Sequence, residues 1–298
     1  MGINGGTGIV GSGAALGGSG IHINRGGVAP FVGLLDTYPN AAAAYSVRRL
    51  SSTYAGSAME VRIDTVGQPL YDIGFDENGD LDTADLISKA AGNDAFVRTW
   101  YDQSGNGNDA QNTTVSGQPN IVTAGIINSE NSKYCLTLNG SSMKFNLPAG
   151  LLTFTNQDNS CYAITKSNNN STRERVVYFG NGTSTRMNLA YDSTLNGVTY
   201  VNSTGFSNGI FTTTIKRGFQ FMLFGDKSGT TQELFSNTTS IGSNSKGSNV
   251  IGANGSLFAG DTIQFFNGTC QEVVLFNESY KSQIIGIFNN VNQYYTLP

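Results

Sequence analysis

Short β-prone runs follow one another from about residue 31 to the C-terminus, and turns rich in Asn, Gly and Ser separate them. Many short strands with few helices predict an all-β fold, a jelly roll or sandwich with a few short helices. The predicted strands are residues 59–63, 70–74, 96–101, 134–138, 144–146, 161–165, 176–179, 186–191, 197–201, 210–214, 218–224, 232–235, 249–251, 263–266 and 271–276.

Three segments are predicted to be helical. Residues 41–52 form the first helix, and residues 83–91 form a short second one. Asp82 would cap the second helix at its N-terminus, and Gly92 would stop it. The third helix covers residues 279–294 and presents one apolar stripe to the sheet. That stripe consists of Ile284, Phe288, Val291 and Tyr295.

One cooperative domain should bury large side chains from the strands and the last helix. The residues expected to be largely buried are Trp100, Tyr101, Val274, Phe276, Ile284 and Phe288. The three cysteines, Cys135, Cys161 and Cys270, lie beside strand-like residues and are expected to be buried small hydrophobes. An odd count without close spacing argues against a disulfide framework, although a single bridge between two of them stays open.

Charge and hydropathy exclude several classes of function. The net charge of −4 and the lack of a Lys/Arg cluster argue against nucleic-acid binding. No run of 18 apolar residues exists, so membrane insertion is not expected. The N-terminus has neither a charged segment nor a long apolar one, so it does not read as a signal peptide. The single histidine, His22, rules out a multi-histidine metal site.

The chain divides into a glycine-rich arm, residues 1–30, and a sandwich domain, residues 31–298. Eleven of the first 27 residues are glycine, so ordering the arm is entropically costly and needs a partner. We expect an extended arm that pairs with another chain and makes the protein a homo-oligomer, with a trimer favoured. The aliphatic side chains expected to anchor it are Ile3, Ile9, Val10, Ile21 and Ile23.

The run Trp100-Tyr101-Asp102-Gln103-Ser104-Gly105-Asn106-Gly107-Asn108-Asp109-Ala110 is the most distinctive motif. It reads as the end of a strand that enters a tight turn, in which Asp and Asn side chains bond backbone amides. Residue chemistry alone therefore predicts a rigid corner. If this corner binds a sugar, the expected ligand-binding residues are Trp100, Asp102, Asn106 and Asn108.

This motif, with runs at 35–38, 41–50, 54–57, 61–62 and 72–75, resembles the catalytic domain of fungal-type α-L-arabinofuranosidases over about 75 residues. That resemblance implies a concanavalin A- or laminin-G-like sandwich. The same block also resembles one found in lectin-like virion proteins of phages that infect Bacteroidota-type hosts. The C-terminal run 271–276, followed by 284–295, resembles the last strand and closing helix of such sandwiches.

Glycosidase chemistry needs two carboxylates that flank the scissile bond. The middle and late parts of the chain offer eight: Glu130, Asp158, Glu174, Asp192, Asp226, Glu233, Asp261 and Glu272. The arabinofuranosidases it resembles set their nucleophile in an Asp-Leu-Glu-Asn-Gly-type context and line the pocket with an adjacent cysteine pair. Neither motif appears here, and a scaffold alone does not carry an activity. The sequence thus predicts that the protein is not an enzyme.

The loop 76–82 places oxygen ligands at alternate positions, as in the first half of an EF-hand loop. Leu81 stands where that loop requires glycine, and Ile87 replaces the bidentate glutamate. A turn with a helix cap explains the pattern, and calcium binding by Asp76, Asn78 and Asp80 stays open as the alternative.

These observations together predict a phage virion structural protein: a head fibre, spike or tail-associated adhesin. It would be made in the host cytoplasm and released by lysis, with residues 1–30 bound to other virion proteins. The displayed domain would attach to a host-surface polysaccharide. The alternatives are a glycoside hydrolase of arabinofuranosidase type and a capsid-decoration protein that binds no glycan.

Overall fold

The computed structural model describes residues 30–152, 157–168, 173–180, 185–192, 197–204, 209–212, 218–245, 255–260 and 264–298. The predicted strand at 249–251 lies outside these ranges, as do parts of the strands predicted at 210–214 and 263–266. The five arm residues expected to mediate assembly also lie outside them.

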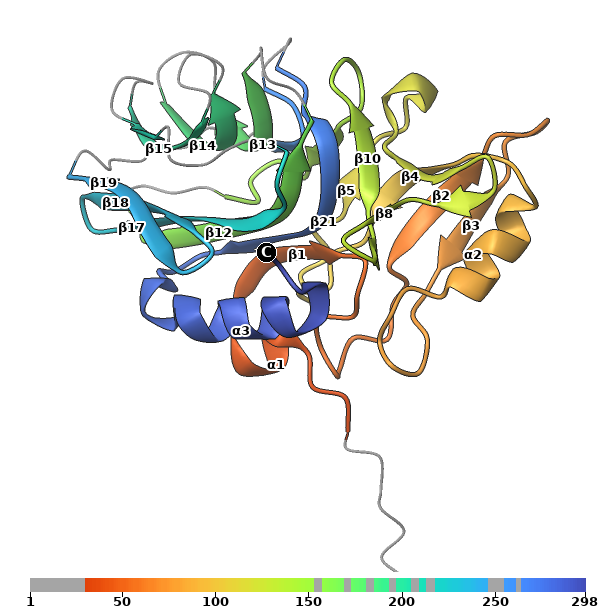
Figure 1. The fold of residues 1–298 in the computed structure, drawn as a ribbon, viewed down its shortest axis with the longest axis horizontal. Coiled ribbons are helices and arrows are strands. Elements are labelled where there is room, and N and C mark those ends of the chain that lie inside the picture. Colours follow the sequence, from red (N-terminus) through yellow and green to blue (C-terminus); the bar gives the residue numbers. More distant parts are fainter. Residues whose placement is uncertain are drawn as a thin grey trace, which may run out of the picture. The chain divides into compact units, whose positions relative to one another are not determined.

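Residues 31–298 form a two-layered β-sandwich, as the sequence predicts (Figure 1). In the first layer, β21 is central: β12 pairs along one side, and β1 and β10 pair along the other. Beyond β12 the layer continues through β17, β18 and β19. The strands of this layer are β1 (Ala41–Ser46), β10 (Leu136–Asn139), β12 (Asn159–Ser167), β17 (Phe221–Ser228), β18 (Thr231–Ser236), β19 (Thr239–Asn244) and β21 (Asn267–Phe276).

The second layer is antiparallel and runs in the spatial order β5–β11–β20–β13–β14–β15–β16. Its order differs from the chain order because β20 inserts between β11 and β13. Its strands are β5 (Ala110–Gln111), β11 (Phe145–Leu147), β13 (Glu174–Gly180), β14 (Thr185–Asp192), β15 (Gly197–Thr204), β16 (Ile210–Thr212) and β20 (Gly255–Leu257).

The two layers are connected through β4, which pairs with β5 of the second layer and with β2 and β6. In turn, β6 pairs with β10 of the first layer and with β7. The strands at this edge are β2 (Met59–Ile63), β3 (Leu70–Ile73), β4 (Ala95–Trp100), β6 (Asn120–Thr123) and β7 (Ile126–Ile127), with a separate hairpin of β8 (Ser129–Glu130) and β9 (Lys133–Tyr134).

Short helices cover the outside of the sandwich. In Figure 1, α3 lies against the face of the first layer that points away from the second layer. None of the described helices combines the length and the apolar character needed to cross a membrane. The helices are α1 (Leu34–Thr37), α2 (Thr83–Ala90), α3 (Ile284–Tyr295) and the 3-10 turns η1 (Val115–Gly117) and η3 (Lys281–Gln283).

The second predicted helix is confirmed in detail. The carboxylate of Asp82 accepts a hydrogen bond from the backbone amide of Asp85, which caps α2. Ala91 ends the helix in the left-handed conformation, and Gly92 follows with φ +87°. The prediction of a helix over residues 41–52 is wrong, because residues 41–46 form β1, paired with β21. All six residues of β1 are buried, so tertiary pairing decides their conformation.

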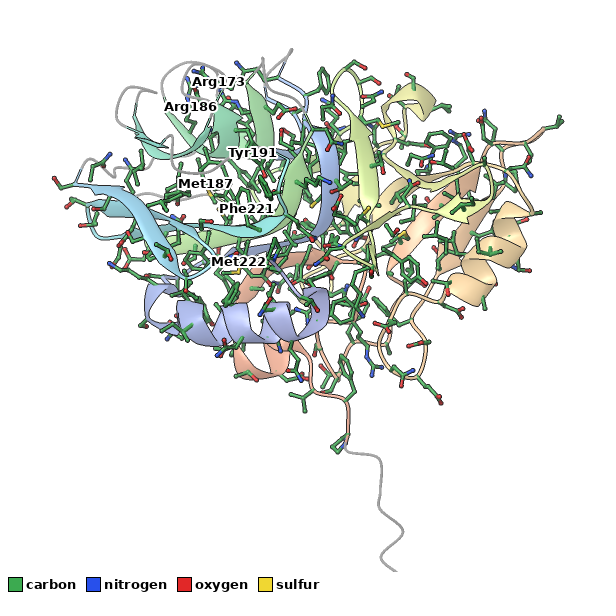
Figure 2. All side chains as sticks on the ribbon, in the orientation of Figure 1. Arg173, Arg186, Met187, Tyr191, Phe221 and Met222 are labelled. Atoms are coloured by element: carbon green, nitrogen blue, oxygen red, sulfur yellow. The ribbon has the colours of Figure 1, made fainter. Side chains whose placement is uncertain are left out.

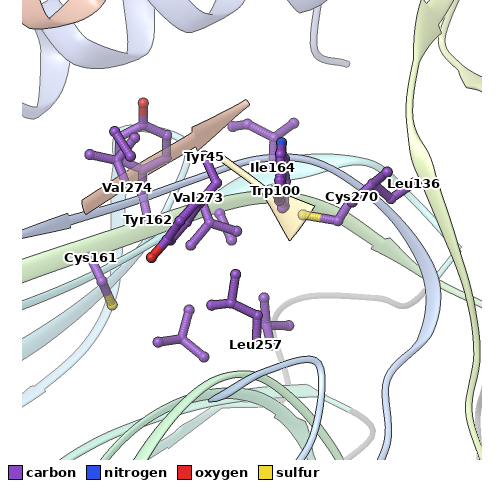
Figure 3. Packing of buried hydrophobic residues seen from close by; sticks show 14 of the residues in the cluster. Tyr45, Trp100, Leu136, Cys161, Tyr162, Ile164, Leu257, Cys270, Val273 and Val274 are labelled. Atoms are coloured by element: carbon purple, nitrogen blue, oxygen red, sulfur yellow. The ribbon is translucent and has the colours of Figure 1, made fainter. Parts of the chain in front are cut away.

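A chain of aromatic rings runs through the interior between the layers. Successive ring centroids from Tyr45 through Trp100, Phe258 and Phe266 to Tyr191 lie 5.7–6.4 Å apart. Figure 3 shows part of this core, with Trp100 among side chains from β1, β12 and β21. Burial of Trp100, Val274, Phe276 and Ile284 is confirmed, whereas Tyr101 and Phe288 are only partly buried. All three cysteines are buried and unbridged.

Candidate functional site

The distinctive corner that follows β4 is a structural clamp on β1. Asp102 is 4% exposed, and its carboxylate accepts hydrogen bonds from the backbone amides of Ala44, Ser104 and Asn108 at 2.8–3.0 Å. A fourth bond comes from the Ser104 hydroxyl at 2.7 Å. Because its bonds all serve the backbone and its own loop, this carboxylate fixes the corner.

The other residues expected to bind a ligand there also have internal partners. The side-chain amides of Asn106 and Asn108 donate to the carbonyls of Ala41 and Ala42 at 2.8 and 2.9 Å. Trp100 is fully buried, and its indole nitrogen donates to the carbonyl of Ser46 at 3.2 Å. The structure therefore gives these side chains a role in the fold, and sugar binding by them stays a prediction.

The loop with the proposed calcium ligands is a hydrogen-bonded turn. One oxygen of Asp76 accepts bonds from the backbone amides of Asn78 and Asp80, both at 2.9 Å. Among the residues that the structure describes, no group of three or more His, Cys, Asp or Glu side chains is arranged to hold a metal ion.

Glu272 of β21 is fully buried, and partners within the fold occupy both of its carboxylate oxygens. Arg48 holds its carboxylate at 2.7 Å, and the hydroxyls of Tyr162, Ser46 and Tyr295 donate to it at 2.6–3.0 Å. Burial alone would raise the pKa of Glu272, but the charge of Arg48 and these hydrogen bonds hold it below its usual value. Its role is to tie β1, β12 and α3 to β21.

Asp226 and Glu233 oppose each other on β17 and β18, yet both serve the start of the C-terminal helical segment. The hydroxyls of Ser160 and Ser279 donate to Asp226 at 2.7 and 2.8 Å. Burial raises the pKa of Asp226, and these hydrogen bonds offset only part of that rise. Glu233 forms an ion pair with Lys281. Asp226 and Glu233 therefore both anchor the segment that leads into α3.

Three further carboxylates hold structural contacts. Glu174 is fully buried and accepts hydrogen bonds from the hydroxyl of Ser167 and the backbone amide of Asn267. Glu130 pairs with Lys166 at 3.1 Å, and Asp158 accepts a bond from the backbone amide of Gly229. Asp261 lies outside the described residues.

Asp192 lies on the face of the second layer that points away from the core. Tyr191 points inward, where its ring stacks on Phe266, so the next residue of the strand points outward. Nε and Nη2 of Arg173 donate to the Asp192 carboxylate at 2.9 and 2.8 Å, and Asp192 is only 1% exposed. In Figure 2, Arg173 and Arg186 lie on the side of β13 and β14 away from the other layer, at opposite ends of the strand pair, whereas Met187 and Tyr191 lie toward the other layer.

Buried polar side chains surround Asp192 on this outer face. Arg175 packs over the ring of Tyr178, with 5.4 Å between its guanidinium carbon and the ring centroid. Ala190 pairs with Arg175 and contributes only a methyl group between Asn188 and Asp192 on the same face. Gly260 lies close to this face, because an added Cβ there would lie 3.1 Å from Cγ of Arg175.

Asn188 is the most informative residue of this face. It is fully buried, and neither the nitrogen nor the oxygen of its amide has a hydrogen-bond partner among the described residues. Leaving a buried amide unpaired costs free energy, so each such group calls for an explanation. A ligand with hydroxyl groups would satisfy both atoms of this amide. We call Arg173, Arg175, Tyr178, Asn188 and Asp192 the outer polar face.

Sequence reasoning included Asp192 among eight carboxylates but missed Arg173, Arg175, Tyr178 and Asn188. Alternation along β14 would have placed Asn188 and Asp192 on one face. The partners on β13 had no such signal, because the register shifts between Arg175 and Val177.

Comparison with known proteins gives the class of fold. Neither a family model nor a curated protein matches this sequence. Among solved structures, the chain is similar to a GH54 α-L-arabinofuranosidase soaked with a cyclic sulfate inhibitor, with 16% identity and a TM-score of 0.62. An arabinofuranosidase complexed with arabinofuranosyl-α-1,2-xylobiose gives 16% identity and a TM-score of 0.63. Each match covers 84% of this chain and 62% of the other.

The fold is therefore a β-sandwich like that of arabinofuranosidases, and the chain spans about 62% of the length of the solved structures it matches. This finding overturns two predictions. The predictions of a phage virion protein and of a protein without enzymatic activity are wrong, because the two solved structures described above, which share the fold over 84% of this chain, are arabinofuranosidases. The missing nucleophile motif and cysteine pair do not exclude glycosidase activity, since that chemistry requires two placed carboxylates rather than one particular motif.

Proposed function

We propose that this protein is a glycoside hydrolase of the α-L-arabinofuranosidase type. The sandwich that it shares with arabinofuranosidases supports this, as does the resemblance of residues 35–110 to their catalytic domains. The observation that carries the proposal is the outer polar face, where Asp192 and the unpaired amide of Asn188 are buried on one strand.

Glycoside hydrolysis needs one carboxyl group that protonates the departing oxygen and a second that attacks the sugar or activates water. We assign Asp192 to the second role, because two nitrogens of the Arg173 guanidinium hold its carboxylate in place at 2.9 and 2.8 Å. The acid would be another of the carboxylates that the sequence offers, and an amide variant of each would identify it. Asn188 would bond hydroxyl groups of the bound sugar.

The direct test is hydrolysis of 4-nitrophenyl α-L-arabinofuranoside by the purified chain, measured as release of nitrophenol from acidic to neutral pH. We expect turnover above protein-free buffer, and faster turnover than with the 4-nitrophenyl β-D-xylopyranoside and β-D-galactopyranoside controls. No release from any of these three substrates would overturn the proposal.

A further inference from the structure

A row of side chains crosses the second layer at right angles to its strands, on the face that points away from the core. Gln111 of β5 pairs with Asn146 of β11, which pairs with Ser256 of β20. Ser256 pairs with Tyr178 of β13, and Tyr178 pairs with Asn188 of β14. Directly paired residues point to the same face, so these five polar side chains form one line. With about 4.8 Å between strands, the line is about 19 Å long.

One end of this row is the buried amide of Asn188, and the other end opens into a groove of about 430 Å³. The groove lies between the corner loop that follows β4 and the end of β11. Its lining includes Asp109, Gln111, Thr113, Asn146, Leu147 and Pro148.

Three polar side chains of the groove make no hydrogen bond to the rest of the described protein. Among the described residues, the exposed side chains of Gln111, Thr113 and Asn146 have no hydrogen-bond partner. Asp109 is held in place, because one of its oxygens accepts a bond from the backbone amide of Asp102 at 2.9 Å. The clamped corner therefore fixes a carboxylate at the wall of the groove.

These groups suit a neutral sugar. Amide and carboxylate groups bond pairs of adjacent hydroxyls, since they offer donors and acceptors at fixed spacing. Pro148 offers an apolar surface for the C–H face of a sugar ring. The lining residues include no arginine or lysine, so nothing in the groove selects an anionic group.

We propose that this groove is a second sugar subsite, which binds a neutral sugar unit of an oligosaccharide whose cleaved end occupies the outer polar face. The protein would then act on glycan chains rather than on short glycosides. This inference rests on the proposed function, because it takes the ligand to be a glycan. Its test measures binding, so the two proposals can fail separately.

The test is calorimetric titration of the intact chain, carrying Asp192→Asn to slow hydrolysis, with arabinohexaose and xylohexaose and with the corresponding bioses. We expect one of the two hexaoses to bind about tenfold more tightly than its biose, the gain of one or two added hydrogen bonds. Gln111→Ala and Asn146→Ala should remove that gain. In the otherwise wild-type chain, both should leave hydrolysis of 4-nitrophenyl α-L-arabinofuranoside unchanged.

Gln293→Ala is the matched control, because Gln293 is an exposed glutamine on α3. It should leave the hexaose affinity unaltered. Three results would overturn the proposed subsite. The first is equal affinity for hexaose and biose, the second is full hexaose affinity in both groove variants, and the third is no binding of either hexaose. Tight hexaose binding without any hydrolysis by the wild-type chain would instead uphold the subsite and refute the proposed activity.

Discussion

Nε of Arg48 lies 2.7 Å from Oε2 of Glu272, and both side chains are almost completely buried. Tyr295 of α3 donates to the same carboxylate, so the ion pair joins β1, β21 and the C-terminal helix. Removing one partner would leave an uncompensated buried charge. We expect Glu272→Gln or Arg48→Met alone to lower the free energy of unfolding by about 3–5 kcal/mol.

The double variant Arg48→Met/Glu272→Gln should cost less than the sum of the two single changes, because it leaves no unpaired charge. Chemical denaturation of all four proteins measures this coupling. Strictly additive costs would show that the two groups do not stabilise each other.

Because Asp226 is buried, we predict that the free energy of unfolding depends on pH through this residue. Its pKa is raised above the ordinary value of 3.8, so the folded state favours the protonated form. The contribution of Asp226 to stability is therefore present at low pH and is lost as the pH rises through its raised pKa. Asp226→Asn should remove this loss. The difference in unfolding free energy between variant and wild type, followed from pH 3.8 upward, should grow in favour of the variant. A constant difference would argue against a raised pKa.

Substitution of Trp100 tests the packing of the aromatic core. This residue is fully buried and contacts the rings of Tyr45, Phe145 and Phe258. We expect Trp100→Ala to cost about 3–5 kcal/mol of unfolding free energy. Trp100→Phe should cost less, because it keeps one ring in the cluster. Thermal unfolding of both variants gives the comparison, and equal costs would contradict this account of the packing.

Asn188 should show opposite effects on stability and on function. Replacing a buried, unpaired amide with an apolar group of similar size removes a desolvation cost, so Asn188→Leu should stabilise the free protein by about 1 kcal/mol. The same variant should bind sugar less well and raise KM. Asn159→Leu is the control, because the hydroxyl of Tyr200 donates to Asn159 and the variant should be destabilised. A destabilised Asn188→Leu would mean that the amide serves the fold.

The sequence predicted those elements whose signals are local. Asp82, Asp85 and Gly92 specify α2 within a few residues, and the structure matches them. The prediction of a helix at residues 41–46 was wrong because the conformation of these residues is set by pairing with β21, more than 200 residues away. Long-range pairing of this kind overrides local propensity.

The outer polar face and the groove were beyond sequence reasoning for the same reason. Gln111, Asn146 and Asn188 belong to one row only because β20 inserts between β11 and β13. Nothing in the sequence separates Asp192 from the seven other carboxylates, since the distinction lies in the face each one occupies. The corner motif was correctly interpreted as rigid, because its Asx turns are local.

The most direct measurement is a carboxylate scan, in which kcat/KM for 4-nitrophenyl α-L-arabinofuranoside is compared between wild type and amide variants of all eight carboxylates. Asp192→Asn should lower kcat/KM by about 10²–10⁴-fold while keeping the wild-type fold by circular dichroism. Glu233→Gln and Glu130→Gln, whose residues hold ion pairs elsewhere, should change it little. Full activity in Asp192→Asn, together with loss in Glu233→Gln or Asp226→Asn, would place the active site on the other layer and contradict the account.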